Sequence, residues 1–238
     1  MLSDRSRLRF LRYMIMAALS VVAVTTKVTS SALPPLKSHP LPPTLAQWET
    51  VSEVGDYFSA IEESPLGYLL WSEFPVTVYL DQSEQDEKWR EAVETAVQEW
   101  NRYFPLQVSD DRATAHIIIT RSRPPLNTTR NPETGIMELS RARSARTRYE
   151  FALKPTNEGK KLIHRMKIEI SPDQSQRHTL ATVRHEIGHA VGIWGHSPNP
   201  EDALYFSQVR NASPISDRDL NTLKRIYQQP TRLGHPIN

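Results

Sequence analysis

The sequence predicts an α+β domain, in which a twisted mixed sheet of about five strands packs on two long helices and a small C-terminal subdomain ends in a helix. Two patterns predict this class: short segments that alternate apolar and polar residues, and longer ones with apolar residues every three or four positions. Their order along the chain is strand, helix, four strands and a second helix. We expect this domain to span residues 71–230 and to be followed by a tail, residues 231–238.

Residues 1–32 have the composition of an export signal. Four arginines precede the apolar run Tyr13–Val24, and small residues follow at Ser30–Ala32. The apolar run is too short to cross a bilayer core as a helix, and its flanks are typical of a cleaved signal peptide. We therefore expect a secreted or periplasmic protein without stable membrane insertion, with an uncleaved signal anchor as the alternative.

Residues 33–70 are expected to form a spacer followed by a helical segment. Five prolines in residues 33–44 favour an extended, polyproline-like chain. Residues Leu45–Ile61 are compatible with one amphipathic helix. Its apolar face would consist of Trp48, Val51, Val54 and Phe58. The segment is either a removable pro-segment or a brace for the domain, and the sequence does not distinguish the two.

The domain begins with a strand and a helix. Phe74–Leu80 alternates with β-branched residues, as strands do. Ser83, with Asp86 three residues later, forms a capping-box pattern that predicts the start of a helix running to Phe104. The apolar stripe of this helix would be Trp89, Ala92, Val93, Ala96, Val97 and Trp100.

Four further strands are expected before the second long helix, at residues 105–109, Ala115–Thr120, Arg148–Leu153 and His164–Ser171. Ala115–Thr120 is apolar enough to be a central strand. The arginine-rich residues 141–148 are either a solvated loop or edge strand, or one flank of a binding cleft. Near the end of the chain, a capping box of Ser216 and Asp219 predicts a closing helix.

The predicted helix Thr179–Val191 carries the motif H-E-x-x-H. His185 and His189 are four residues apart, which places their Cβ atoms about 5–6 Å from each other on one helix face. Two ring nitrogens can then reach one ion at about 2.0–2.1 Å. Glu186 is displaced by roughly 100° around the helix, so it lies beside the ion, where a carboxylate can accept a proton from water. The spacing predicts a metal site with an adjacent general base.

Two glycines and a third histidine strengthen this prediction. Gly192 can adopt a positive φ, end the helix and turn the chain back towards the metal, and His196 follows that turn. Gly188 costs about 1 kcal/mol in the middle of a helix, which indicates close packing at its position. We therefore expect the metal ligands to be His185, His189 and His196. Asp202 is the alternative third ligand.

The pattern H-E-x-x-H-x-x-G followed by His resembles the metzincin zinc metalloproteases, and the likeness extends over about 160 residues. The chain from Phe74 onwards is most similar to their matrixin-like members. The segments that carry this likeness are AVETAVQEW, HSPNPEDALYF and ISDRDLNTLKRIY. The resemblance implies a metzincin fold of α/β type, one catalytic Zn2+ and a polypeptide substrate.

The chain departs from the family pattern at two places. Three residues separate Gly192 from His196, where the family has two. The additional residue lengthens the chain by up to about 3.3–3.6 Å, and we expect Gly195 to absorb it through a bulge that only glycine adopts easily. Leu204 stands where the family has the methionine of its Met-turn. Because Leu and Met have similar volumes, Leu204 is expected to form the hydrophobic base beneath the ligands.

Composition narrows the function classes further. Lys and Arg number 29 against 27 Asp and Glu, which argues against a nucleic-acid or membrane partner. The absence of cysteine excludes disulfides, thiolate zinc sites and a cysteine nucleophile. Calcium is not indicated, because the segments rich in Asp and Gly that bind it in vertebrate matrixins have no counterpart. His116, His164 and His178 stand singly and are expected to be ordinary residues. We expect a monomer.

The sequence therefore predicts an exported zinc endopeptidase in which Glu186 acts as general base and then passes the proton to the leaving amine. Two alternatives remain: a non-catalytic zinc-stabilised module that binds peptides, and a zinc hydrolase that acts on a non-protein amide. Glu186 favours an enzyme over a binding module, because a purely structural zinc site has no use for a carboxylate beside an open position.

Overall fold

A computed structural model describes residues 33–82, 86–126, 128–130, 133, 135, 137–139, 143–157, 159–207 and 213–237. These residues belong to one compact unit. None of the helices in these ranges combines the length and the apolar composition needed to cross a membrane. The expected signal peptide, residues 1–32, lies outside the described residues.

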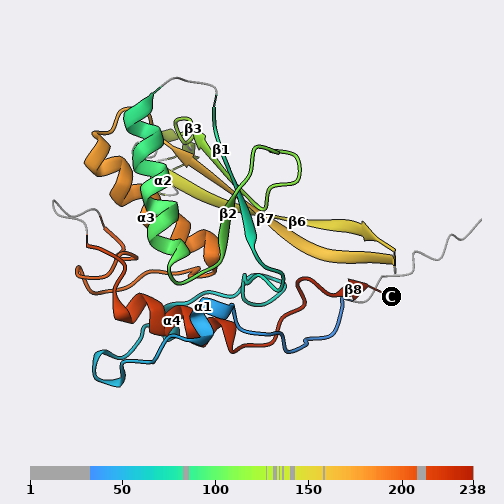
Figure 1. Ribbon diagram of the computed structural model, residues 1–238. Coiled ribbons are helices and arrows are strands. Elements are labelled where there is room, and N and C mark those ends of the chain that lie inside the picture. Colours follow the sequence, from blue (N-terminus) through green and yellow to red (C-terminus); the bar gives the residue numbers. More distant parts are fainter. Residues whose placement is uncertain are drawn as a thin grey trace, which may run out of the picture. The chain divides into compact units, whose positions relative to one another are not determined.

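The main sheet is mixed, as predicted, and has the strand order β2-β1-β3-β7-β6, with β8 pairing on β7 (Figure 1). Its strands are β1 (Val76–Leu80), β2 (Leu106–Val108), β3 (Ile117–Arg121), β6 (Ala145–Thr156), β7 (Gly159–Ile170) and β8 (Pro236–Ile237). β1 pairs in parallel with β2 and β3, and β3 pairs in parallel with β7. β6 is antiparallel to β7 and forms the edge of the sheet.

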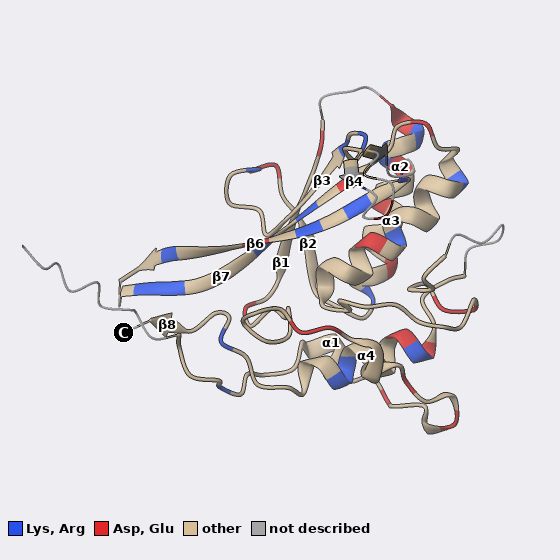
Figure 2. Ribbon diagram, turned by 180° about the vertical axis from the view of Figure 1, so that it is seen from behind, with Lys and Arg blue, Asp and Glu red and all other residues tan. Residues whose placement is uncertain are grey.

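β6 and β7 are longer than the sequence predicts. They pair from Ala145–Ile170 to Thr156–Gly159, whereas β3 pairs only with Met166–Ile170 of β7. The rest of the two strands therefore extends past β3 as a ribbon (Figure 1). Lys and Arg residues are spaced along both strands (Figure 2). A ribbon that extends past the sheet does not need the apolar alternation of a half-buried strand. The charged residues interrupt that alternation, so the sequence predicts strands that are too short.

A small second sheet was not predicted. It consists of the antiparallel strands β4 (Thr128–Arg130) and β5 (Met137–Leu139). Three residues are too few to show the period-two pattern by which a strand is identified in a sequence.

Two long helices lie side by side against the main sheet (Figure 1), α2 (Glu87–Asn101) and α3 (Gln176–Val191). α2 buries all six residues of its predicted apolar stripe. Its N-cap is Asp86, whose carboxylate accepts a hydrogen bond from the Trp89 amide at 3.0 Å. Asp86 is thus the cap itself and not the third helical residue of a capping box; Ser83 lies outside the described residues.

The single helix predicted over Leu45–Ile61 is wrong. α1 covers only Pro43–Ala46 and is followed by two isolated 3-10 turns, η1 (Ser52–Val54) and η2 (Phe58–Ala60). Gly55, at a φ of 67°, leaves the helical path. The Asn221 side chain instead bonds the Val51 amide and carbonyl at 3.3 and 2.9 Å and the Gly55 carbonyl at 2.9 Å. These backbone groups are therefore satisfied by another part of the chain.

Residues 33–70 share the core of the domain expected from residue 71. Leu45, Leu69 and Leu70 are fully buried in it. The segment runs along α4 (Asp217–Tyr227), which begins with the predicted capping box of Ser216 and Asp219. A β-bridge between Lys37 and Thr231 joins the start of the segment to the end of the chain. In this structure the segment packs as part of the domain.

Candidate metal centre

α3 carries the motif H-E-x-x-H, and its C-terminal end is held by two side chains. The Trp71 indole donates to the Ala190 carbonyl at 2.9 Å, and the Tyr227 hydroxyl donates to the Val191 carbonyl at 2.7 Å. The last carbonyls of a helix have no partner within it, so these bonds satisfy groups that would otherwise be buried and unpaired. The position of the histidines is thereby fixed from two other elements.

Gly192 ends α3, as predicted, at a φ of 134°. A Cβ at this position would lie 3.0 Å from the Leu69 carbonyl oxygen. Both the backbone conformation and the space therefore require glycine. The chain turns there and brings His196 towards α3.

The three predicted ligands converge. His185, His189 and His196 each place one possible ligand atom within 4.8 Å of the others. The Nε2 atoms of His185 and His189 are 3.1 Å apart. In a tetrahedral zinc site with bonds of about 2.0–2.1 Å, the ligand atoms are about 3.3–3.4 Å from each other. The spacing of this pair is close to that value.

The hydrogen bonds of His185 and His189 determine their tautomers. The His185 Nδ1 lies 2.9 Å from the Ala203 carbonyl oxygen, and the His189 Nδ1 lies 2.7 Å from the Ile193 carbonyl oxygen. A carbonyl oxygen only accepts, so both Nδ1 atoms carry hydrogen. Both Nε2 atoms then direct lone pairs into the same space, an arrangement that repels unless a cation lies between them. These two side chains could therefore hold a metal ion between them.

The local environment favours neutral imidazoles. Burial, together with the nearby His185, lowers the pKa of His189 well below its usual value. Partial burial also lowers the pKa of His196, while the Glu62 carboxylate opposes that shift. Neutral imidazole is the form that binds metals.

Glu186 lies beside the histidines and is almost completely buried. Its Oε2 accepts a hydrogen bond of 2.5 Å from the Thr147 hydroxyl on β6. Burial raises the pKa of the Glu186 carboxyl, whereas the charge of His185 and the bond from Thr147 lower it. Thr147 was not predicted as a site residue, although it falls in the arginine-rich stretch that was considered as a flank of the cleft.

Gly195 has a different role from the predicted one. Its φ is not positive, so it does not absorb the additional residue through a conformation special to glycine. Residues 57–62, here called the strap, pack directly against it. Ile61 and Gly195 form an antiparallel bridge, and the Glu62 amide donates to the Trp194 carbonyl at 2.8 Å. A Cβ on Gly195 would collide with the Ala60 carbonyl oxygen.

Asp202, the alternative third ligand, is not part of the histidine cluster. This carboxylate is buried and accepts hydrogen bonds from Ser197, from Ser216 at 2.7 Å and from Arg218 at 3.0 Å. Its acceptor sites are engaged in holding the loop after His196 onto α4.

Leu204 packs against Gly188 of α3, the helix that carries His185 and His189. It is fully buried, and a Cβ on Gly188 would collide with its methyl groups and lie 3.0 Å from the Trp100 ring. The close packing predicted at Gly188 is therefore confirmed. The neighbouring Ala203 carbonyl is the one that orients His185.

The site opens into a cleft of about 310 Å³. The three histidines and Glu186 line it together with Glu62 of the strap, with Trp194 and Gly195, and with residues of and just before β6. The arginine-rich stretch contributes Arg143, Arg146 and Thr147 to this lining, so it is an edge strand and one flank of the cleft at once.

No known protein-family model matches this chain, and no curated protein shows detectable similarity to it. The resemblance to metzincins therefore rests on the residues of the chain alone.

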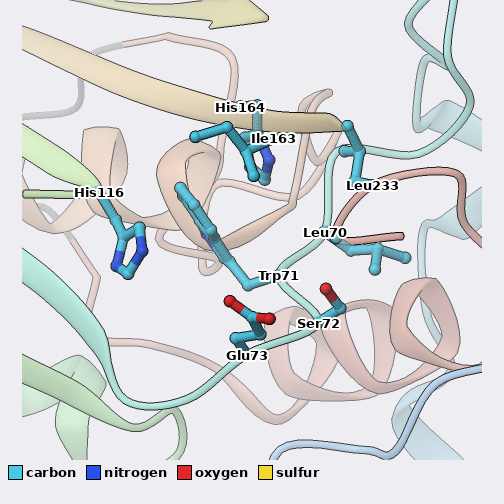
Figure 3. A pocket seen from close by; sticks show the side chains of 9 residues that line it. Leu70, Trp71, Ser72, Glu73, His116, Ile163, His164 and Leu233 are labelled. Atoms are coloured by element: carbon cyan, nitrogen blue, oxygen red, sulfur yellow. The ribbon is translucent and has the colours of Figure 1, made fainter. Parts of the chain in front are cut away.

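Two of the remaining histidines lie at a smaller cavity of about 30 Å³. Trp71 stands between them (Figure 3): its ring stacks on His164 at 3.8 Å and lies 5.3 Å from His116. His116 accepts a hydrogen bond from the Thr77 amide at 3.0 Å. Among the described residues, neither histidine belongs to a cluster of three metal-binding side chains.

Proposed function

We propose that this protein is a zinc-dependent endopeptidase of the matrixin-like metzincin kind. The observation that carries the proposal is the pair of Nε2 atoms, 3.1 Å apart, whose rings are held by carbonyl acceptors on their opposite sides. Three imidazoles and no thiolate form a donor set typical of catalytic zinc sites. When bound, zinc would supply Lewis acidity, which polarises a carbonyl and lowers the pKa of water.

The residues around the site would handle the proton. Glu186 would take a proton from the attacking water and deliver it to the leaving amine. The hydrogen bond from Thr147 holds the carboxylate in position for both transfers. The burial of Glu186 keeps bulk water from solvating the carboxylate.

The edge of the sheet supports a peptide as substrate. β6 pairs with β7 along one side and, among the described strands, with none along the other. Ala145, Arg146 and Thr147 of this edge line the cleft. An extended peptide can add to such an edge through main-chain hydrogen bonds, which brings one of its carbonyls near the histidines.

Digestion of a peptide library by purified protein tests the proposal. We expect hydrolysis that a chelator abolishes and added zinc restores. Glu186→Gln should keep one zinc per chain but lose at least about a hundredfold in rate, as expected for removal of a general base. His185→Ala and His189→Ala should lose the metal, because too few donors remain to compete with water; His178→Gln, at an exposed histidine of α3, should retain it.

The outcomes separate the alternatives. Normal turnover in Glu186→Gln would contradict its role as general base. A zinc-loaded protein that binds peptides without cleaving them would identify a binding module. Zinc binding with neither peptide binding nor cleavage would leave the hydrolase of a non-protein amide.

A further inference from the structure

The strap is held at both of its ends by hydrogen bonds to other parts of the chain. At its start, the Tyr57 hydroxyl donates to Asp219 at 2.6 Å, and the Tyr57 amide donates to the Thr222 hydroxyl at 3.0 Å. At its end, Ile61 and Glu62 pair with the backbone of Gly195 and Trp194. The backbone of Glu62 is therefore held in place beside the third metal ligand.

The Glu62 carboxylate belongs to the cleft. The residue is exposed and lines the cavity together with His196. Among the described residues, Glu62 forms no ion pair. An exposed carboxylate without a partner inside a binding cleft is available to a ligand.

Trp194 lines the same cavity and has a fixed ring. The residue is partly buried, and its indole packs edge-on against Tyr149 at 5.1 Å and against His189 at 5.8 Å. An aromatic ring that is already ordered loses little conformational freedom when a ligand packs on it.

The cleft also carries positive charge. Arg143 and Arg146 line it, and Arg146 forms an ion pair of 2.7 Å with Glu169. Apart from Glu186, Glu62 is the acidic residue of this lining. A cationic side chain of a substrate can therefore meet a carboxylate at the strap.

We propose that Glu62 and Trp194 form a subsite that selects peptides with a Lys or Arg side chain near the scissile bond. The inference rests on the proposed peptide hydrolysis. The apolar stem of Lys or Arg can pack on an indole while its cationic head reaches a carboxylate, so that both contacts act on one side chain. An acidic side chain at the same position is repelled by Glu62. Glu62 is then a specificity-determining residue.

Matched peptides that differ at one position test the subsite. Peptides carrying Lys, Gln or Glu are compared at each position on both sides of the scissile bond. We expect one position at which kcat/KM is highest for Lys. Glu62→Gln should reduce the ratio of Lys to Gln about two- to fivefold, the usual effect of an exposed ion pair. Glu62→Lys should reverse the preference towards Glu.

The neighbouring Glu63 provides the control. It is also exposed, but its carboxylate bonds the Tyr68 hydroxyl and does not line the cleft. Glu63→Gln should leave the Lys-to-Gln ratio unchanged. A second readout does not depend on turnover: the dissociation constants of the same peptides for the Glu186→Gln protein, measured by fluorescence anisotropy alongside zinc content, should show the same order.

Failure of this inference differs from failure of the proposed function. If peptides are cleaved but the ratio is the same in wild type, Glu62→Gln and Glu62→Lys, the subsite is wrong and the peptidase stands. If the zinc-loaded protein neither cleaves nor binds any peptide, both are wrong. If only Glu63→Gln changes the ratio, the selecting carboxylate is Glu63.

Discussion

Thr147 contributes a single hydroxyl group that holds the Glu186 carboxylate of the candidate site in position. Among the described residues, Thr147 is the only one whose side chain donates a hydrogen bond to the Glu186 carboxylate, at 2.5 Å. Hydrogen bonds to charged groups contribute about 1.5–3 kcal/mol. We therefore expect Thr147→Val, which keeps the shape and removes the hydroxyl, to lower kcat/KM by at least about tenfold. Zinc content should not change.

Thr147→Ser is the matched control, because it retains the hydroxyl and should keep most of the activity. The comparison requires kcat/KM and metal analysis on the three proteins. Equal rates for the serine and valine variants would show that the hydrogen bond does not position Glu186.

His164 is predicted to make the protein sensitive to acid. It is buried beneath Trp71, and its Nε2 has no hydrogen-bond partner among the described residues. Burial, with a smaller contribution from the charge of His116, lowers the pKa of His164 to about 3. Below about pH 6.5 the unfolded chain binds a proton that the folded chain does not. The free energy of unfolding should therefore fall by roughly 1.4 kcal/mol per pH unit between pH 6.5 and 3.

His164→Phe keeps the aromatic stack and removes the titrating group. Its unfolding free energy, measured with urea in the presence of a chelator, should depend less on pH than that of the wild type over this window. His178→Gln, at an exposed histidine, serves as the control. Parallel pH profiles for wild type and His164→Phe would exclude His164 as a source of the acid sensitivity.

The site residues that the sequence predicts lie close together in the chain. His185, Glu186 and His189 share one helix, so their spacing alone determines how their side chains are arranged around it, and His196 follows the turn at Gly192 that ends this helix. Thr147 is separated from Glu186 by 39 residues and reaches it only because β6 forms the sheet edge beside α3. Glu62 reaches the cleft only through the strap. Neither the contact of Thr147 with Glu186 nor the position of Glu62 at the cleft can be recognised from a local sequence pattern.

At the scale of the element, the strap explains why residue 195 is glycine. The prediction of a special backbone conformation there was wrong, because the requirement comes from the Ala60 carbonyl of a distant segment. We expect Gly195→Ala to destabilise the protein by about 1–3 kcal/mol through overpacking. It should also weaken zinc binding, since the loop to His196 or the strap must shift. Thermal unfolding and zinc titration measure the two effects.

Gly195→Asn distinguishes the two explanations. Asn tolerates positive φ better than Ala does, so a conformational requirement would make Asn the milder substitution. A steric requirement makes Asn at least as damaging as Ala. A more stable, zinc-binding Asn variant would contradict the role assigned to the strap.

Residues 45–61, for which one helix was predicted, show where helical periodicity misleads. Trp48 and Phe58 have the spacing of an amphipathic helix, and both pack against the core. They are buried by different contacts along an irregular chain, not by a common helix face. The apolar stripe of α2 predicts a helix correctly because the whole stripe is buried against one surface, formed by the sheet and α3. A pattern of burial predicts an element only when one continuous surface buries it.

At the scale of the whole molecule, the fold class is predicted by the order of the elements, whereas the path of residues 33–70 is not. The mixed sheet and its two helices follow from segments with clear periods. The course of the N-terminal segment depends on polar side chains of α4, such as Asn221 and Asp219, that bond its backbone and Tyr57. Such pairings carry no signal in a single sequence.

Removal of residues 33–70 is therefore expected to unfold the protein. Leu45, Leu69 and Leu70 are completely buried, and burial of each stabilises the fold by about 1.5–3 kcal/mol. Together they approach the total stability of a typical domain, about 5–15 kcal/mol. A chain that begins at Trp71 should lack a cooperative urea transition and should not retain zinc. A chain that begins at Leu33 should unfold cooperatively in urea and should retain zinc. A pro-segment would give the opposite result: the chain beginning at Trp71 would remain folded, bind zinc and hydrolyse peptides at least as fast as the longer one.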